Sequence, residues 1–243
     1  MTFMSDTNGA PLRRFRDCIP LDDDLVIEGD NLDVLPRLPD GAFDLIYIDP
    51  PFNTGRTQAR GERGYEDAFD DYAGFLRPRL EHARRLLAEH GTLYVHLDPR
   101  ESHYVKVMLD GLFGRDCFLN EIVWAYDYGA RTKRRWPAKH DTILVYVRDR
   151  ARYWFDAEAV DREPYMAPGL QRSAERAARG KLPTSVWWHT IVPTTSREKT
   201  GYPTQKPEGI VRRIVAASSR PGGWCLDFFA GSGTLGAVCA RLG

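Results

Sequence analysis

Short apolar runs alternate with amphipathic stretches along most of the chain. Residues Phe43–Ile48 are almost all apolar, with β-branched and aromatic members, which predicts a strand buried on both faces as in a parallel sheet. Apolar side chains recur at helical spacing over Ser102–Phe113. The same patterns predict strands at residues 25–27, 92–97, 121–126, 142–147 and 224–229, and helices at 32–38, 72–90, 207–218 and 231–242. This alternation predicts an α/β fold, with a parallel sheet covered by helices on both faces.

Two stretches interrupt the alternation. Residues 54–72 are polar and rich in glycine and charge, which predicts a mobile loop before the helix that Gly91 is expected to cap. Residues 127–200 are irregular apart from the strand at 142–147 and a basic, helix-like run at 171–181. The regular pattern returns after residue 200, so the irregular stretch is expected to be an insertion in an α/β body.

The composition is that of an ordinary soluble protein. The 243 residues are 42% hydrophobic and 28% charged, enough for one core with a modest insertion. No stretch approaches a membrane span, and the first residues lack the apolar run of a secretory signal. The four cysteines are scattered, which argues against a disulfide framework or a zinc site. These features predict a cytoplasmic protein.

The net charge of zero conceals an uneven distribution. Residues 127–200 hold about 15 Lys and Arg against about 9 Asp and Glu, so the middle of the chain is basic and the remainder acidic. A cluster of four cations, with Trp136 beside it, directly follows the strand at 121–126. Its members are Arg131, Lys133, Arg134 and Arg135. This pattern is compatible with a nucleic-acid-facing region, although a solvated charged loop explains it as well.

The Asp49-Pro50-Pro51-Phe52 motif follows the strand Phe43–Ile48, at the strand end where open α/β sheets bind ligands. An exocyclic amino group on a nucleobase is a poor nucleophile because its lone pair is delocalised into the ring. A carboxylate from Asp49 and the main-chain carbonyl of Pro50 can accept its two N–H bonds and hold it pyramidal. Phe52 offers a ring on which a base rotated out of a duplex can stack. A simple strand-ending turn is the competing interpretation.

A glycine-rich turn occurs near the end of the chain, between the strand at 224–229 and the last helix. It runs through Asp227, Phe228, Phe229, Ala230, Gly231, Ser232, Gly233 and Thr234. Its glycines allow a ligand to approach the backbone closely, and their spacing also fits a dinucleotide-binding fingerprint. That fingerprint needs an acidic residue about twenty positions further on, beyond the last residue given. A phosphate-binding Walker loop is excluded because no Gly-Lys-Ser/Thr follows. A nicotinamide enzyme therefore stays open on this motif.

These motifs, with Thr204-Gln205-Lys206-Pro207 ahead of the helix at 207–218, occur in a specific order. In that order the sequence resembles the circularly permuted, beta-group amino-methyltransferases of DNA, from residue 25 to residue 242. In that family the Asp-Pro-Pro-Tyr/Phe motif comes first, the target-recognition region follows, and the cofactor-binding Phe-x-Gly-x-Gly motif comes last. The further matching stretches are Gly29-Asp30-Asn31, residues 45–55 and Tyr202-Pro203.

The resemblance implies a Rossmann-like methyltransferase fold that uses S-adenosylmethionine. It divides the chain into a catalytic half at residues 1–126, a last strand with a target-recognition region at 127–200, and a cofactor-binding half at 201–243. Asp49, Pro50, Pro51 and Phe52 are the expected catalytic residues. The expected cofactor residues are Asp30, Thr204, Gln205, Lys206, Pro207, and Asp227 to Thr234 as spelled out above. Of these, Asp227 corresponds to a carboxylate near the amino-acid moiety of the cofactor, Lys206 and Pro207 wall the methionine side, and Asp30 lies near the adenine ring.

Within this family, an aspartate at the head of the motif favours adenine N6 over cytosine N4 as the methylated atom. Methylation of a cytosine ring carbon needs a nucleophilic cysteine after a proline, and none of the four cysteines follows a proline. Related motifs in RNA or protein-amide methyltransferases usually have the cofactor loop first. The expected activity is therefore site-specific methylation of adenine N6 after base flipping, and cytosine N4 is the alternative.

Relatives continue past the last helix into another strand, whose end carries an acidic residue for the cofactor ribose. The sequence given stops at Gly243. We therefore expect the fold to lack its last strands, with a gap in the sheet between the strands that end at Phe229 and Asp30. Weak cofactor binding and low activity are expected for this chain, and a DNA-binding fragment with impaired catalysis is a second hypothesis.

Double-stranded DNA is the expected partner. The basic cluster at Arg131, Lys133, Arg134 and Arg135 is expected to bind the phosphate backbone, with the sequence reader between residues 148 and 199. A second copy of the chain and a restriction endonuclease are further candidate partners, and the expected location is the nucleoid of a prokaryote or a phage-infected cell. No metal site is expected, since the six histidines lack metal-ligand spacing. His140 and Asp141 are interpreted as a pair at a strand entry.

Overall fold

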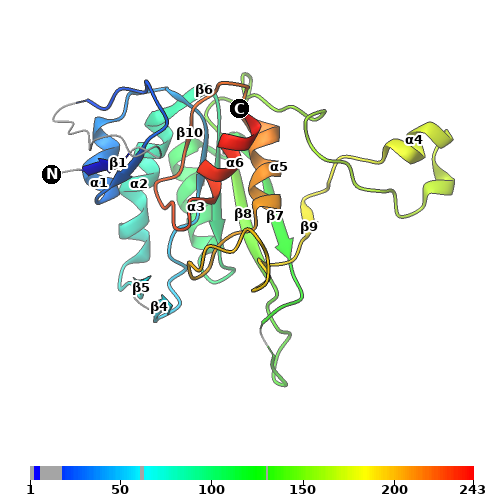
Figure 1. The fold of residues 1–243 in the computed structure, drawn as a ribbon, viewed down its shortest axis with the longest axis horizontal. Helices are drawn as coiled ribbons and strands as arrows, with labels where there is room; N and C mark the ends of the chain where they lie inside the picture. The colour runs from blue at the N-terminus through cyan, green and yellow to red at the C-terminus, as the bar shows by residue number, and fades with distance from the viewer. Residues whose placement is uncertain (1–2, 6–17, 61–62, 130) are drawn as a thin grey trace.

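A six-stranded sheet forms the centre of the molecule, in the order β10-β3-β6-β8-β7-β9 (Figure 1). The computed structural model describes residues 3–5, 18–60, 63–129 and 131–243. The strands of this sheet are β3 (Phe43–Ile48), β6 (Leu87–Leu97), β7 (Phe118–Ala125), β8 (His140–Val147), β9 (Val186–Trp188) and β10 (Cys225–Leu226).

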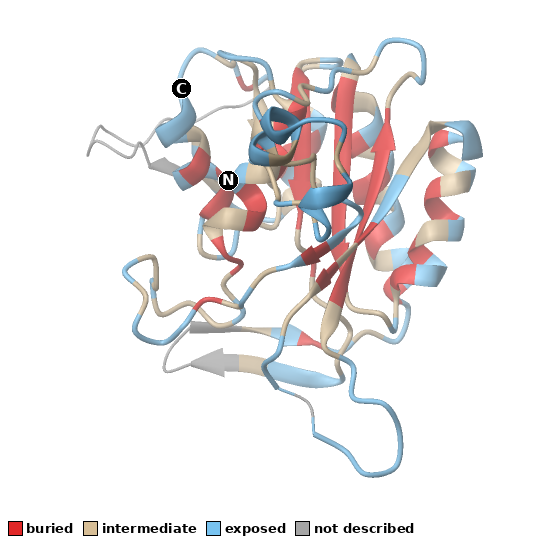
Figure 2. Cartoon of the chain, turned by 90° about the vertical axis from the view of Figure 1, so that its right-hand side faces the viewer, coloured by how far each residue is buried: buried red, intermediate tan, exposed pale blue. Residues whose placement is uncertain are grey.

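Helices cover both faces of this sheet, as the sequence pattern predicted (Figure 2). The helices are α1 (Asn31–Val34), α2 (Tyr72–Leu86), α3 (Ser102–Phe113), α4 (Ala174–Arg179), α5 (Glu208–Ser218) and α6 (Thr234–Leu242). Successive side chains of β3 point to opposite faces, so Ile46 and Ile48 pack with α2 and α3, whereas Leu45 and Tyr47 pack with α5 and α6. The two apolar layers make β3 a fully buried strand.

The sheet is mixed, so the expectation of a parallel sheet was wrong in its second half. Strands β10, β3 and β6 are parallel, but β8 is antiparallel to both β6 and β7. The loop between β7 and β8 returns the chain without a crossover helix, which imposes an antiparallel pair. β9 then pairs in parallel with β7 through the tryptophan pair, a strand that the sequence analysis did not predict.

Gly91 does not cap a helix. Helix α2 ends at Leu86, and Gly91 lies inside β6, where a Cβ atom would come within 2.7 Å of the Phe43 carbonyl oxygen. Glycine is therefore needed for the close approach of β3 rather than for a left-handed turn. Residues 54–72 are not all loop either, because β4 (Arg56–Arg60) and β5 (Arg63–Asp67) form an antiparallel hairpin.

β2 (Val26–Glu28) lies outside the six-stranded sheet. It pairs with β1 (Phe3–Ser5) in a separate two-stranded sheet, so β2 and β10 are not neighbours. β10 is therefore an edge strand of the six-stranded sheet. No helix in the described part of the chain is long and apolar enough to cross a bilayer.

Candidate active site

Two carboxylates meet at the carboxyl edge of the sheet. Asp49 directly follows β3 and Asp227 directly follows β10, and these two strands are adjacent and parallel. Since parallel neighbours end at the same edge, the two side chains reach one site although 178 positions separate them in the sequence. This edge is where the α/β architecture places ligands.

An open cavity of about 280 Å³ lies between these strand ends. Most of the residues expected from the two motifs line it together. Those residues are Asp49, Pro51, Thr204, Gln205, Lys206, Asp227, Phe229, Ala230, Gly231, Ser232 and Thr234. Three tyrosines that were not among the expected site residues complete the wall, namely Tyr47, Tyr65 and Tyr202. The expected residues outside this lining are Asp30, Pro50, Phe52, Pro207, Phe228 and Gly233.

The carboxylate of Asp49 has two different surroundings. Its Oδ2 atom accepts a hydrogen bond of 2.7 Å from the ammonium of Lys206, and this ammonium also lies 4.7 Å from the ring centroid of Phe52. Its Oδ1 atom is buried and has no hydrogen-bond partner among the residues that the structure describes. A buried acceptor without a donor is unfavourable, so the geometry leaves Oδ1 ready for a donor from a ligand.

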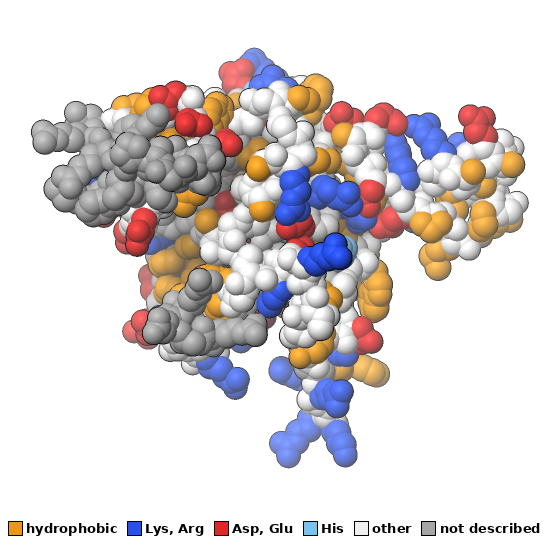
Figure 3. All heavy atoms as spheres, viewed as in Figure 1, with side chains coloured by type: hydrophobic (Ala, Val, Ile, Leu, Met, Phe, Trp, Pro, Cys, Tyr) orange, Lys and Arg blue, Asp and Glu red, His pale blue; other side chains and the backbone are white. Residues whose placement is uncertain are grey.

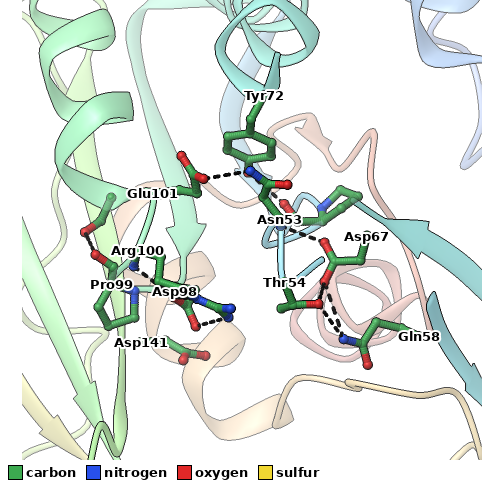
Figure 4. A network of polar contacts seen from close by, with 12 residues as sticks. Asn53, Thr54, Gln58, Asp67, Tyr72, Asp98, Pro99, Arg100, Glu101 and Asp141 are labelled. Atoms are coloured by element: carbon green, nitrogen blue, oxygen red, sulfur yellow. Dashed lines mark hydrogen bonds and ion pairs between the residues drawn. The ribbon is translucent and has the colours of Figure 1, made fainter. Parts of the chain in front are cut away.

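The turn that carries Asp49 is braced from the hairpin side (Figure 4). Asn53 adopts a left-handed backbone conformation, with φ of 54°, which asparagine tolerates better than most residues. Its main-chain N–H donates to Asp67 at 2.7 Å and its side-chain amide donates to Glu101 at 2.8 Å. The hydroxyl of Tyr72 donates to the Pro51 carbonyl at 2.7 Å. These bonds tie the turn to β5, α2 and the loop before α3.

Asp227 lies in a poorly solvated position. Its Oδ1 atom accepts a hydrogen bond of 2.9 Å from the Phe229 N–H, which shapes the start of the glycine turn. Desolvation by burial raises the pKa of Asp227 to about 7, the Phe229 N–H opposes this shift, and the negative charge of Asp49 adds to it. Asp227 therefore changes charge near neutral pH.

The glycine turn needs its glycines for two reasons. Gly231 and Gly233 have φ angles of 52° and 75°, in the left-handed region that favours glycine. A Cβ atom on Gly231 would also lie 3.3 Å from the Tyr202 ring, so a larger residue would crowd the contact between the turn and this ring. Gly233 is the N-cap of α6, so the turn delivers the N-terminus of this helix to the cavity.

The segment before α5 forms the wall opposite the strand ends. Thr204 has a φ of 60°, which is strained for a β-branched residue, and its hydroxyl lies 3.3 Å from that of Tyr65 on β5. Gln205 donates to the Glu198 carbonyl at 2.6 Å and so holds the segment in place. The β4–β5 hairpin thereby reaches across to the cofactor-binding half expected from the sequence.

Asp30 has a local structural role in addition to any role toward a ligand. Its side chain caps α1 by accepting from the Leu32 N–H at 2.9 Å, and it lies 3.5 Å from the guanidinium of Arg79. Its side chain is 59% exposed. The neighbouring Asn31 donates to the Phe228 carbonyl at 2.9 Å, which links α1 to the turn after β10.

The basic cluster lies apart from the cavity, on the loop between β7 and β8. Lys and Arg side chains gather at the tip of this loop, which projects from the body of the molecule (Figure 3). Arg131, Lys133, Arg134 and Arg135 are all exposed. In the ranges that the structure describes, no group of three or more His, Cys, Asp or Glu residues is arranged to hold a metal ion.

Two of the three tyrosines lie in stretches that match the family, but the sequence assigned none of the three a role in the site. Tyr47 lies inside the apolar run of β3, where its hydroxyl is hidden among core positions. Tyr65 belongs to a polar hairpin that was expected to be a loop, and Tyr202 to a segment without regular structure. Their shared location depends on tertiary structure.

Comparisons with known proteins agree on one group. The model of a DNA methylase family, which covers N6 and N4 enzymes, matches residues 43–243. The DNA adenine methyltransferase YhdJ of Escherichia coli (strain K12) is 32% identical over 228 residues, which cover 90% of this chain and 75% of YhdJ. The type II methyltransferase M.HpaI of Haemophilus parainfluenzae is 30% identical over 220 residues, which cover 90% of this chain and 68% of M.HpaI.

Two solved structures share the fold. The cytosine-N4-specific PvuII DNA methyltransferase has a TM-score of 0.64 at 15% identity, over 88% of this chain and 76% of its own. The M1.HpyAVI–SAM complex has a TM-score of 0.52 at 18% identity, over 83% of this chain and 78% of its own. At these identities the likeness concerns the arrangement of strands and helices.

Proposed function

The chain belongs to the N6/N4 DNA methylase family, and on that premise we propose that it transfers a methyl group from S-adenosylmethionine to the N6 atom of adenine in double-stranded DNA. Its fold is the Rossmann-like α/β fold of DNA methyltransferases, in the permuted order that places Asp49 before the glycine turn. The observation that carries the proposal is the buried Oδ1 atom of Asp49 at the cavity between the strand ends, which has no partner among the described residues.

The cavity residues suit the amino-acid end of S-adenosylmethionine. Asp227 offers a carboxylate to an ammonium group, and Gly231 lets a ligand approach the backbone of the turn. Lys206 supplies a positive charge within reach of a ligand carboxylate. The cofactor, when bound, supplies an electrophilic methyl group on a sulfonium.

Asp49 acts on the target amino group in this proposal. Lys206 holds Oδ2, so the carboxylate is oriented before a base arrives, and Oδ1 accepts one N–H of the amino group. The Pro50 carbonyl accepts the second N–H, which draws the lone pair out of conjugation and toward the methyl group. With the cofactor bound, its methyl group would pass from the sulfonium sulfur to the amino nitrogen held by Asp49 and Pro50, and that nitrogen would then release a proton to water. Such preorganised acceptors stabilise the developing charge.

Phe52 is the proposed stacking surface for the flipped base. Its ring lies beside the ammonium of Lys206, which also pairs with Asp49, so the ring is next to the proposed catalytic carboxylate. A base must leave the duplex for its amino group to reach Asp49 in the cavity. Stacking on an aromatic ring then compensates in part for the stacking lost in the duplex. The exposed basic loop between β7 and β8 is the proposed binding surface for the DNA phosphate backbone.

Adenine is favoured over cytosine by two observations. The acidic head of the motif is the type that favours adenine in this family, and the relative YhdJ is named a DNA adenine methyltransferase. Cytosine N4 is the second candidate, because the cytosine-N4-specific PvuII enzyme has a similar fold. Both atoms are exocyclic amino groups, so the same acceptors serve either base.

We further infer a bacterial setting and a cytoplasmic location at the nucleoid. YhdJ and M.HpaI both come from bacteria, and M.HpaI is named a type II methyltransferase, which supports a restriction endonuclease as a functional partner. Association into a homodimer stays a prediction from the sequence resemblance.

The test is transfer of labelled methyl groups to unmethylated DNA, followed by digestion to nucleosides and mass spectrometry. We expect N6-methyladenine with the wild-type chain and a loss on the order of 10²–10³-fold with Asp49→Ala. Asp116→Ala, an exposed aspartate remote from the cavity, is the matched control and should retain full activity. N4-methylcytosine as the product would select the second candidate, and DNA binding without transfer would reject both.

A further inference from the structure

A fully buried histidine lies behind the proposed stacking surface. His96, on β6, has no solvent exposure, and both of its ring nitrogens have partners. Its Nδ1 atom is 2.9 Å from the hydroxyl of Tyr47, and its Nε2 atom is 3.0 Å from Oδ2 of Asp141 at the start of β8. Three neighbouring strands thus contribute a Tyr47–His96–Asp141 chain of hydrogen bonds to the core.

The donors in this chain can be assigned from Asp141. Its other oxygen accepts a bond of 2.9 Å from the Tyr126 hydroxyl. Burial acts to raise the pKa of Asp141, but the hydrogen bond and charge of His96, the charge of Lys206 and the hydrogen bond of Tyr126 together outweigh it, so this pKa lies below its usual value. An ionised carboxylate only accepts, so Nε2 of His96 carries a proton and donates it to Asp141.

The imidazole contacts both parts of the proposed reaction site. Its ring centroid is 6.0 Å from that of Phe52, at an interplanar angle of 34°, and it packs edge-on against Trp124 at 5.5 Å. Its partner Tyr47 lines the cavity that Asp49 and Asp227 share. The orientation of one buried ring therefore affects the stacking surface and the cavity wall together.

Packing by itself does not call for a polar chain at these positions. Burying an ionised carboxylate and an imidazole is unfavourable unless every polar atom is satisfied, and apolar residues of similar size usually stabilise a core at least as well. The neighbouring positions on these strands are apolar and equally buried, such as Val95 on β6 and Ile143 on β8. The polar residues occur where the core meets Phe52.

We propose that His96 is a positioning residue for methyl transfer, oriented by Asp141, and that it sets the plane of Phe52 and the place of the Tyr47 side chain. This inference rests on the proposed function. In the transfer step the ring makes no bond to the substrate; it fixes the surface against which the base stacks, so that the amino group meets the carboxylate of Asp49 in one geometry.

Two conservative variants test the role of the Tyr47–His96–Asp141 hydrogen bonds. Asp141→Asn preserves volume but offers only one acceptor, and Tyr47→Phe removes only a hydroxyl. We expect kcat to fall about 10–100-fold in Asp141→Asn and several-fold in Tyr47→Phe, with KM for S-adenosylmethionine and DNA affinity within about 3-fold of wild type. Because both act through one imidazole, the double variant should lose little more than Asp141→Asn does.

The matched control is Tyr94→Phe. Tyr94 is a buried tyrosine on β6, and its hydroxyl bonds Ser218 at the end of α5 at 2.8 Å instead of the His96 ring. A loss of one buried hydrogen bond lowers the melting temperature in either tyrosine variant, but only Tyr47→Phe should lower kcat. If Tyr47→Phe and Asp141→Asn keep the kcat of Tyr94→Phe, the inference is wrong.

A spectroscopic measurement tests the assignment without reference to activity. In ¹⁵N-histidine spectra of the wild-type chain, His96 should show the Nε2–H tautomer, and Asp141→Asn should shift that signal. An Nδ1–H tautomer in the wild type contradicts the proposed orientation. The two proposals are distinguishable: if the wild type transfers no methyl group, both are wrong, whereas transfer that requires Asp49 but ignores Tyr47 and Asp141 rejects only this one.

Discussion

Individual carboxylates at the strand ends differ in their surroundings, and this difference determines what each can do. Asp49 is paired with Lys206 through one oxygen and keeps the other unpartnered among the described residues. Asp227 has no such cation bonded to it among those residues; its bond comes from the Phe229 N–H. In the proposed function, the first carboxylate accepts from an amino group, and the second attracts a positive charge once it is ionised.

Asp227→Asn tests the second part. The folded-state pKa of about 7 lies above the usual 3.8, so the folded chain binds an extra proton between about pH 4 and pH 7, and the contribution of this group to stability falls as pH rises through that window. Asparagine keeps the Phe229 bond without the charge. We expect the melting temperature of Asp227→Asn to exceed that of the wild type by several degrees at pH 8 but by little at pH 4.

The same substitution should weaken the cofactor complex. At pH 8 the wild-type carboxylate is ionised and can pair with an ammonium, so titration calorimetry should show at least about a tenfold lower affinity for S-adenosylmethionine in Asp227→Asn. Affinity of the wild-type chain should also rise between pH 6 and pH 8. Equal affinities of the two proteins at pH 8 would show that Asp227 does not contact the charged end of the ligand.

The role of a residue could be predicted where its neighbours in the sequence form a recognisable motif. It could not be predicted where the role depends only on contacts made in the folded structure. Asp49 and Asp227 stand beside prolines and glycines that mark a strand end. Asp141 comes from a segment whose neighbours in the sequence carry no such marks. Asp141 was interpreted as part of a strand-entry pair, and β8 does begin there, but its bond to His96 forms across the sheet.

Among the structural elements, the glycine turn needs glycine both for its backbone conformation and for the space beside it. Gly231 needs its left-handed conformation and also the space beside Tyr202. Gly222, in the turn before β10, has a φ of 72°, but a Cβ atom there would meet no atom within 4 Å. The chain therefore offers two glycines with the same backbone requirement and different surroundings.

Gly231→Ala and Gly222→Ala separate these effects. Both variants force an L-residue into the left-handed region, and each should lose about 1–2 kcal/mol of unfolding free energy. Only Gly231→Ala should also lose cofactor affinity, by about tenfold or more in calorimetry, because its methyl group takes up space in the cavity. Equal cofactor affinities in the two variants would place the ligand away from the turn.

Two elements with a clear pattern, β3 and α3, were predicted with their observed bounds, whereas α2 and β10 are shorter than predicted. The apolar run of β3 and the helical spacing of α3 both match. The β4–β5 hairpin was missed because it is polar on both faces, and β9 because three residues are too few to show alternation. Gly91 was misplaced because a glycine after a helix looks the same in sequence whether it caps a turn or admits a neighbouring strand.

The molecule as a whole separates a catalytic body from a basic projection. The strand order brings Asp49 and Asp227 to one edge, and the loop between β7 and β8 carries exposed cations beyond the body (Figure 3). The carboxyl-edge rule made the first arrangement predictable from sequence. The antiparallel turn that projects the loop was not predictable, since the pattern fits a parallel crossover equally well.

Neutralising Arg134 and Arg135 together tests whether the loop between β7 and β8 binds DNA phosphates. The double alanine variant should bind all DNA sequences more weakly, and the slope of log affinity against log salt should become shallower by up to about 2. Arg77→Ala with Arg212→Ala removes the same charge from exposed positions on α2 and α5 and serves as control. A sequence-selective loss, or full affinity at low salt, would contradict a phosphate-binding role.

The most direct test of the account is a crystal structure of the chain with S-adenosylmethionine. The cofactor is expected in the cavity between β3 and β10, with its amino-acid end against Asp227 and the glycine turn and its sulfonium methyl directed toward Oδ1 of Asp49. A cofactor bound elsewhere, for instance in the second cavity between β7 and α5, would contradict the account. So would a cofactor in the expected cavity whose methyl group points away from Asp49.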